Sequence, residues 1–267
     1  MKRTIQYILT LLVATAPLSA DSIDPKALSA EEAGLAIATE RDARDIGFHD
    51  FEAELRMVLR NRHGQESTRS LRSRTLEQET DGDKSLVVFD APADISGTAL
   101  LTFSHKTGDD DQWLYLPALK RVKRISSSNK SGPFVGSEFA YEDISSQEIE
   151  EYTYKFLREE ELEGRPMYVI EQYPVDPESG YTRQVAWVDR DELRNFRVDF
   201  YDRKDTLLKT LTYEGYLQYL DKHWRPGLMK MVNHQTGKST DLHWDNYQFQ
   251  SGLDEGDFNR AVLARTR

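Results

Sequence analysis

The clearest pattern in the chain is an alternation of apolar and polar positions that starts after Phe48. One side of an extended chain there carries the apolar residues Phe51, Ala53, Leu55, Met57 and Leu59. Mostly charged residues fall on the other side, and a period of two is typical of a β-strand with one buried face. A turn at 63–65 and a weaker alternation over 66–79 predict the returning strand of a hairpin.

Short apolar segments separated by turn residues continue to the end of the chain. Before the middle of the sequence they lie at 85–90 and 97–105. After it they predict strands at 152–157, 167–173, 183–189, 196–202, 207–219, 227–235 and 240–249. Gly, Pro and Asp residues stand between them, so the spacing indicates an antiparallel meander.

Two segments favour helices instead. Residues 29–46 place small apolar side chains mostly on one helical face, with Ser29 as N-cap and Gly47 as the stop. Residues 254–265 predict a short closing helix. The chain is therefore expected to be mainly β with a few helices, an α+β protein.

The stretch 111–146 differs from the rest. An apolar run from Trp113 to Leu116 ends at Pro117, which indicates the end of a buried strand. The segment that follows is rich in basic and small polar residues and predicts a mobile basic loop, with cations at Lys120, Arg121, Lys123 and Arg124.

Beyond that loop, residues 138–144 predict a short helix with Ser137 as N-cap. A strand, a basic loop and an aromatic helix in this order suggest a lid over an apolar site. The alternative is an ordinary surface loop followed by a packing helix, since a charge run is usually a solvated face.

The same stretch resembles the signature of the outer membrane lipoprotein-sorting protein-like family, whose fold is that of the lipoprotein carriers LolA and LolB. The pattern is D-x-W-x-Y-L-P-x-x-K-R-V-x-R-I followed by K-S-G-x-F-x-G-S-x-F-x-Y-E-D. It is carried by Asp111, Trp113, Tyr115, Leu116, Pro117, Lys120, Arg121, Val122, Arg124, Ile125, Lys130, Ser131, Gly132, Phe134, Gly136, Ser137, Phe139, Tyr141, Glu142 and Asp143.

This resemblance implies a strongly curved antiparallel sheet, an incomplete barrel of about ten or eleven strands, that covers a few helices. It also implies an apolar cavity for lipid chains. Members of the family often occur beside transporters of the resistance-nodulation-division (RND) type, which implies an inner-membrane export partner for this chain.

The N-terminus predicts export. Lys2 and Arg3, an apolar run over 7–16 and small residues up to Ala20 are typical of a signal peptide cut after Ala20. The sequence has no cysteine, which excludes disulfides and a lipid-modified N-terminal cysteine. We therefore expect one domain at 21–267, soluble in the periplasm, with only transient membrane contact.

Charge and motifs exclude several function classes. The formal net charge is −11, which disfavours nucleic acid as a partner. The six histidines show no metal-ligand spacing, and no G-x-S-x-G, phosphate-loop or dinucleotide motif is present. We expect no enzyme activity, no cofactor and no metal; a periplasmic hydrolase would depend only on unassigned His and Glu residues.

Aromatic and methionine side chains supply the candidate ligand site. Methionine adapts to ligands of varied shape, although all these side chains could instead fill a solid core. The candidates are Leu101, Phe103, Trp113, Tyr115, Phe134, Phe139, Tyr141, Trp187, Phe200, Met229 and Met231. The four cations of the basic loop are candidates for contact with a lipid headgroup or an acidic partner surface.

The preferred hypothesis is a periplasmic carrier that shields a lipid or a lipid-modified molecule, such as an acylated lipoprotein, on its way to the outer membrane. An outer-membrane β-barrel protein is the alternative, since strands and 13 tyrosines fit it loosely. Charge on both faces of most strands disfavours that alternative, because a membrane barrel needs an unbroken apolar outer band.

Overall fold

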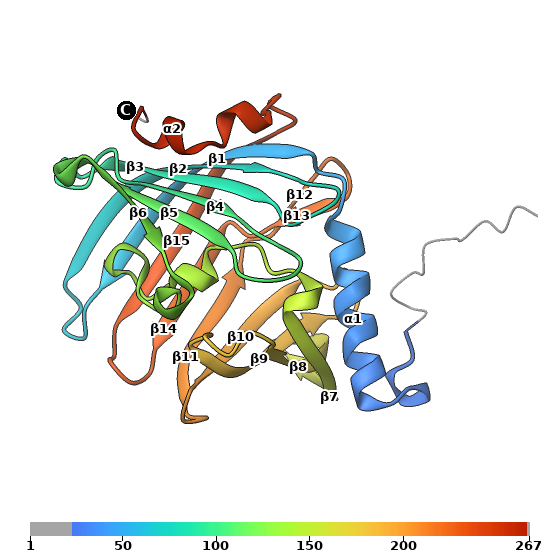
Figure 1. The fold of residues 1–267 in the computed structure, drawn as a ribbon. Coiled ribbons are helices and arrows are strands. Elements are labelled where there is room, and N and C mark those ends of the chain that lie inside the picture. The colour runs from blue at the N-terminus through green and yellow to red at the C-terminus, as the bar shows by residue number, and fades with distance from the viewer. Residues whose placement is uncertain (1–22, 266–267) are drawn as a thin grey trace, which may run out of the picture.

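The computed structural model describes residues 23–265. The predicted signal peptide, residues 1–20, lies outside this part of the chain. The largest feature of the fold is one antiparallel sheet, which is strongly curved (Figure 1). Within residues 23–265, no helix is both long and apolar enough to cross a membrane.

The meander predicted from the sequence is present, and most predicted strands are found within a few residues of their expected bounds. The strands are β1 (Asp50–Arg60), β2 (Glu66–Leu76), β3 (Lys84–Ala91), β4 (Ala99–Phe103), β5 (Asp111–Leu116), β6 (Arg121–Ile125), β7 (Tyr152–Leu162), β8 (Arg165–Pro174), β9 (Tyr181–Asp189), β10 (Asn195–Asp202), β11 (Leu207–Glu214), β12 (Leu217–Tyr219), β13 (His223–Arg225), β14 (Leu228–Asn233) and β15 (Ser239–Phe249).

Two meanders form the main sheet. The strand order is β6-β5-β4-β3-β2-β1-β15-β14-β11-β10-β9-β8-β7, and β1 pairs with β15 where the meanders meet. The edge strands β6 and β7 do not pair with each other, so the sheet is not closed. Strands β12 and β13 make a separate two-stranded hairpin.

The sheet has 13 strands, so the expected count of ten or eleven was wrong. One strand that the expected count left out is β6, because its sequence predicts a loop. Its side chains are exposed except for Ile125, which enters the core, and its backbone pairs with β5 from Leu116–Arg121 to Gln112–Ile125. An edge strand satisfies its backbone on one side and needs little apolar surface, and charged side chains are common there.

The predicted N-terminal helix is confirmed as α1 (Ala30–Asp45). Ser29 caps it, and Glu32 completes a capping box by accepting from the Ser29 backbone N–H at 3.0 Å. The helix packs against β7 (Figure 1). This contact depends on Gly34, because a Cβ there would lie 2.7 Å from backbone atoms of Lys155.

Residues 126–151 connect the two open edges of the sheet, and we call this segment the strap. It contains only three-residue 3-10 turns, at Ser127–Asn129, Phe134–Gly136, Tyr141–Asp143 and Ile149–Glu151. The helix predicted over 138–144 was therefore wrong. Phe134 donates its backbone N–H to the Phe139 carbonyl at 2.7 Å, which folds the segment back on itself and buries both rings.

Both faces of part of the sheet are buried. The concave face packs against α1 and the strap, and it carries the main core. On the convex face, Leu86, Val88 and Leu101 are covered by Phe258 and Leu263. These two residues belong to the C-terminal segment, where the predicted closing helix is a 3-10 turn (Glu255–Asp257) and the short α2 (Arg260–Leu263).

Candidate functional site

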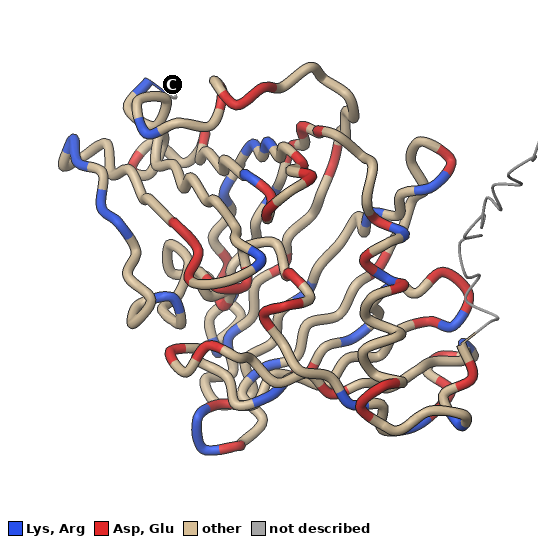
Figure 2. The backbone as a smooth tube through the Cα atoms, turned by 45° about the vertical axis from the view of Figure 1, so that its right-hand side comes forward, with Lys and Arg blue, Asp and Glu red and all other residues tan. Residues whose placement is uncertain are grey.

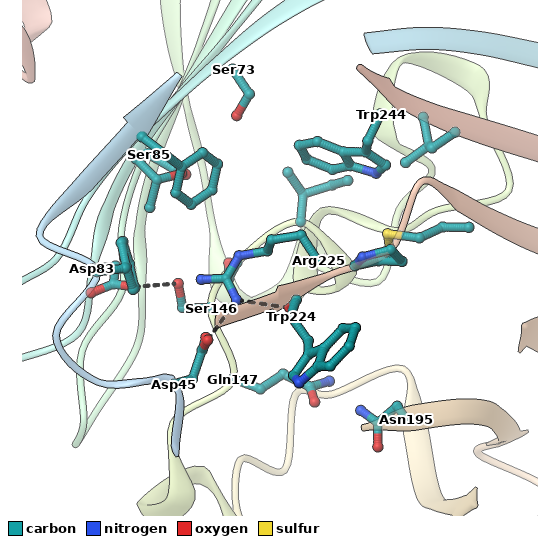
Figure 3. Close-up of a pocket in the computed structure, with 18 of the residues that line it drawn as sticks. Asp45, Ser73, Asp83, Ser85, Ser146, Gln147, Asn195, Trp224, Arg225 and Trp244 are labelled. Atoms are coloured by element: carbon teal, nitrogen blue, oxygen red, sulfur yellow. Dashed lines mark hydrogen bonds and ion pairs between the residues drawn. The ribbon is translucent and has the colours of Figure 1, made fainter. Parts of the chain in front are cut away.

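A cavity of about 450 Å³ lies on the concave side of the sheet. Its wall is the inner face of β1, β2, β3, β14 and β15, and the strap contributes Phe134 and Phe139. The end of α1, the β9–β10 turn and the β12–β13 hairpin surround its opening (Figure 3). This volume is within the range of small-molecule binding pockets, about 300–1,000 Å³.

The register of the strands places the wall residues in rows across the sheet. Nearest the opening, Phe51 pairs with Thr75 and Thr75 with Ser85. The next row contains Ser73 and Val87. Two residues along a strand span about 7 Å, so each row lies about that much deeper than the one before.

The deeper rows are apolar. Leu55 pairs with Leu71 on one side and Trp244 on the other. Met57 pairs with Leu242, which in turn pairs with Met229. The cavity therefore has hydroxyl groups near its opening and an aliphatic and aromatic floor.

Charged side chains surround the opening. Arg225 of β13 donates to Asp45 at the end of α1, with 2.5 Å between Nη1 and Oδ1 (Figure 3). The same guanidinium lies 5.2 Å from the ring centre of Phe48 and 5.6 Å from that of Phe51. Cation–π contacts of this kind hold the Arg225 side chain over an aromatic surface.

Asp83 stands on the opposite side of the opening. The Ser146 hydroxyl of the strap donates to its carboxylate at 3.4 Å, and the backbone N–H of Gln78 donates at 3.2 Å. Burial raises the pKa of Asp83 to about 6. The charges of two neighbouring carboxylates, Glu77 and Asp45, raise this pKa further.

The strap is attached to the sheet by a buried ion pair. Lys209 of β11 contacts Asp143 at 2.5 Å, and their side chains are 4% and 6% exposed. Tyr181 donates to the other oxygen of Asp143 at 2.8 Å. Glu142 accepts from Ser179 at 2.8 Å and from the Gly180 N–H at 2.9 Å. The acidic residues at the end of the signature motif thus hold the strap in place.

Three of the eleven predicted ligand residues line the cavity: Phe134, Phe139 and Met229. Tyr141 packs edge-on against Phe134 with ring centres 5.9 Å apart. Phe200 and Met231 belong to the same core but do not line the cavity.

The other five predicted residues lie away from the cavity. Leu101, Phe103, Trp113 and Tyr115 are on the convex face beneath the C-terminal segment. Trp187 belongs to a separate cluster with Met167 and Val169.

The four predicted basic residues lie together at the β5–β6 hairpin. Lys120, Arg121, Lys123 and Arg124 are all exposed. Arg124 is paired with Asp111 at 2.5 Å, and the other three have no carboxylate within 4 Å among the described residues. Acidic and basic residues are otherwise spread along the whole backbone (Figure 2).

A second cavity of about 380 Å³ lies between the strap, the β4–β5 turn and the β8–β9 turn. Glu151 lines it together with Asp110, Glu142 and Lys130. Burial, and then the charge of Asp110, raises the pKa of Glu151 to about 8. This carboxyl group is therefore largely protonated near neutral pH.

Sequence reasoning missed Trp244, Arg225 and Asp45 at the main cavity. Trp244 sits inside a predicted strand, but nothing local shows that its side of that strand faces the interior. Arg225 and Asp45 are 180 residues apart in the sequence, and only the folded chain brings them together.

Comparisons with known proteins agree with this fold. A family model described as an uncharacterized protein matches residues 81–265. No curated protein matches the chain. A crystal structure named as an outer membrane lipoprotein-sorting protein domain from Vibrio parahaemolyticus is 58% identical, with a TM-score of 0.87, and the match covers 88% of this chain and 100% of that chain.

Two further crystal structures are similar. A DUF1329 family protein from Desulfovibrio piger is 34% identical, with a TM-score of 0.84, over 88% of this chain and 100% of that chain. A LolA superfamily protein from Nitrosomonas europaea is 21% identical, with a TM-score of 0.70, over 88% of this chain and 99% of that chain. The chain therefore belongs to the outer membrane lipoprotein-sorting protein-like family and has the LolA-like fold that its central motif resembles.

Proposed function

We propose that this protein is a carrier that holds a lipid or a lipid-modified molecule in the concave cavity during transport toward the outer membrane. The observation that carries the proposal is the cavity itself, about 450 Å³ with an apolar floor and a charged opening. A small apolar pocket with a few polar groups at one end is the usual form of a small-molecule site. Membership of the outer membrane lipoprotein-sorting protein-like family also supports a carrier function.

The floor residues supply the binding energy. Phe134, Phe139 and Met229 line the cavity beside Met57 and Leu242, and each buried acyl methylene contributes about 0.8 kcal/mol. Methionine side chains adapt to ligands of different shape, which suits a carrier of varied acyl chains. Binding of this kind requires no covalent chemistry and no cofactor.

The proposal places the carrier in the periplasm, with residues 1–20 as its signal peptide, 21–267 as its single domain, and an RND-type transporter as its inner-membrane partner. The exposed cations Lys120, Arg121 and Lys123 contact a lipid headgroup or an acidic partner surface. Two observations support this role. The three side chains are exposed, and they have no acidic neighbours among the described residues although the net charge of the chain is −11.

Extraction of the purified protein with organic solvent, followed by mass spectrometry, tests the proposal. We expect an acylated molecule in the extract and saturable binding of a fluorescent fatty-acid probe by the extracted protein. An empty extract together with no probe binding would contradict the carrier function.

A further inference from the structure

Strand β6 forms one edge of the sheet, and its backbone is paired on one side only (Figure 1). It pairs with β5 from Leu116–Arg121 to Gln112–Ile125, and no other backbone group of residues 23–265 hydrogen-bonds to it. In an antiparallel pair, every second residue of an edge strand directs its N–H and C=O groups away from the neighbouring strand. The outer side of β6 therefore presents free donors and acceptors with which a further strand could pair.

The side chains of β6 alternate between the two faces of the sheet. Arg121 and Lys123 share the concave face with Ile125, which is buried in the main core. Val122 lies on the convex face opposite Tyr115 of β5, and it is 41% exposed. The exposed part of this edge is thus a cation, an apolar residue and a second cation in succession.

The charge of the edge determines which kind of strand fits it. A second copy of β6 would place cations opposite cations, and like charges directly opposite each other destabilise a sheet. The other edge strand, β7, is packed against α1. An acidic strand would place carboxylates opposite Arg121 and Lys123, neither of which has an acidic partner within 4 Å in the described part of the chain. Opposite charges in such cross-strand pairs stabilise the pairing.

We propose that β6 is a docking edge for an extended segment of a partner protein in which acidic and apolar residues alternate. The segment adds to the sheet as a further strand, and its backbone pairs with the outer side of β6. Two of its carboxylates lie opposite Arg121 and Lys123, and the apolar side chain between them lies beside Val122. This inference rests on the acidic partner proposed for the basic hairpin and specifies how that partner binds.

Fluorescence polarisation with three labelled peptides tests the mode of binding. The first peptide alternates glutamate and valine. The second has the same composition with all glutamates at one end, so it cannot place valine between two carboxylates. The third is the alternating peptide with N-methylated backbone amides, which keeps the charges and loses the N–H donors. We expect the alternating peptide to bind most tightly and its N-methylated form to bind about tenfold more weakly or worse.

Charge reversal on β6 tests the two cations. The Arg121→Glu, Lys123→Glu double variant should bind the alternating glutamate peptide about tenfold more weakly and should instead bind an alternating lysine and valine peptide. The control Lys204→Glu, Lys238→Glu makes the same change in net charge at exposed positions in two turns of the other meander. It should leave both affinities unchanged. Equal effects of the two double variants would overturn the inference, because overall charge would then explain the binding.

Hydrogen exchange locates the bound peptide. The alternating peptide should slow exchange of backbone amides within residues 121–125, because the outward N–H groups of β6 become hydrogen-bonded. Protection elsewhere, with none in β6, would overturn the inference.

The remaining outcomes separate this inference from the proposals on which it rests. If all three peptides bind equally well, contact with an acidic partner stands and the addition of a strand is wrong. If no peptide binds but phosphatidylglycerol vesicles do, the hairpin contacts a lipid surface and the inference is overturned. The carrier function is tested separately by the fatty-acid probe, whose binding does not involve β6.

Discussion

The ammonium group of Lys209 lies 2.5 Å from the carboxylate of Asp143, and both side chains are almost completely buried. Asp143 belongs to the strap and Lys209 to β11, so this pair joins the segment that spans the open edges to the middle of the sheet. Lys209 also donates to the Glu138 carbonyl at 3.1 Å. Water does not reach either group, so it cannot take the place of the other partner if the pair is broken.

Breaking this pair should strongly destabilise the fold. In the Lys209→Met variant the Asp143 charge stays buried without a cation, and we expect a loss of about 3–5 kcal/mol in the free energy of unfolding. Urea unfolding measures the change. Lys230→Met, which breaks the exposed pair with Glu214 at 2.8 Å, is the control and should cost about 1 kcal/mol or less. Equal losses in the two variants would contradict the structural role of the buried pair.

The packing of α1 on β7 depends on the absence of a side chain at Gly34. A helix-interior Gly→Ala change usually stabilises by about 1 kcal/mol. Here the added Cβ would meet the Lys155 backbone at 2.7 Å, so we expect Gly34→Ala to destabilise by about 1–3 kcal/mol instead. Thermal unfolding shows whether Gly34→Ala lowers or raises the melting temperature. Thr39→Ala, at an exposed position of the same helix, should leave the melting temperature unchanged or raise it.

The carboxyl group of Glu151 should make the free energy of unfolding depend on pH. Burial raises its pKa from 4.5 to about 8, so between these values the folded state holds a proton that the unfolded state has lost. The contribution of this group is fully present below about pH 4.5 and is lost as the pH rises through 8. Glu151→Gln should therefore flatten the decline in urea midpoint between pH 5 and 8. An unchanged decline would show that this carboxyl group is not protonated in the folded protein.

The basic hairpin should matter for surface contact and not for stability. Lys120, Arg121 and Lys123 are exposed, so replacing all three by Glu should change the unfolding free energy by about 0.5 kcal/mol or less. Each removed cation should weaken attraction to an anionic bilayer by about 1 kcal/mol. Co-sedimentation with phosphatidylglycerol vesicles at low and high salt measures this. Equal binding by the triple variant and the unsubstituted protein would contradict contact with a lipid headgroup. Contact with an acidic partner surface would then be the remaining proposal for these three residues.

Local signals in the sequence were sufficient for much of the fold. The alternation from Phe51 to Leu59 predicts β1, because one face of that strand is buried and the other is mostly polar or half-exposed. Ser29 and Glu32 define the start of α1, because a capping box involves only neighbouring residues. Such features are decided within a few residues and need no knowledge of tertiary structure.

The strap and β6 could not be predicted in the same way. The apolar spacing over 138–144 fits a helix, but Phe139 is needed in the interior together with Phe134, and the turn between them buries both rings. Strand β6 exists because β5 offers a free edge, not because of its own apolar content. Tertiary contacts overrode the local preference in both cases.

The candidate site was only partly predictable for a related reason. Trp113 and Tyr115 alternate correctly for a strand, but alternation does not say which face of a curved sheet is concave. The C-terminal segment with Phe258 buries the convex face of β3 to β5, so aromatic residues there have a packing partner of their own. Phe134 and Phe139 line the cavity because the strap folds into the concave side.

The central claim is that the concave cavity holds the acyl chain, and a cavity-filling substitution tests it most directly. Ser73 lines the cavity and is 4% exposed, whereas Ser70 lies on the other face of the same strand and is exposed. We expect Ser73→Phe to abolish saturable binding of the fluorescent fatty-acid probe, while the matched Ser70→Phe variant binds it as the unsubstituted protein does. Unchanged binding by a folded Ser73→Phe protein would contradict the account.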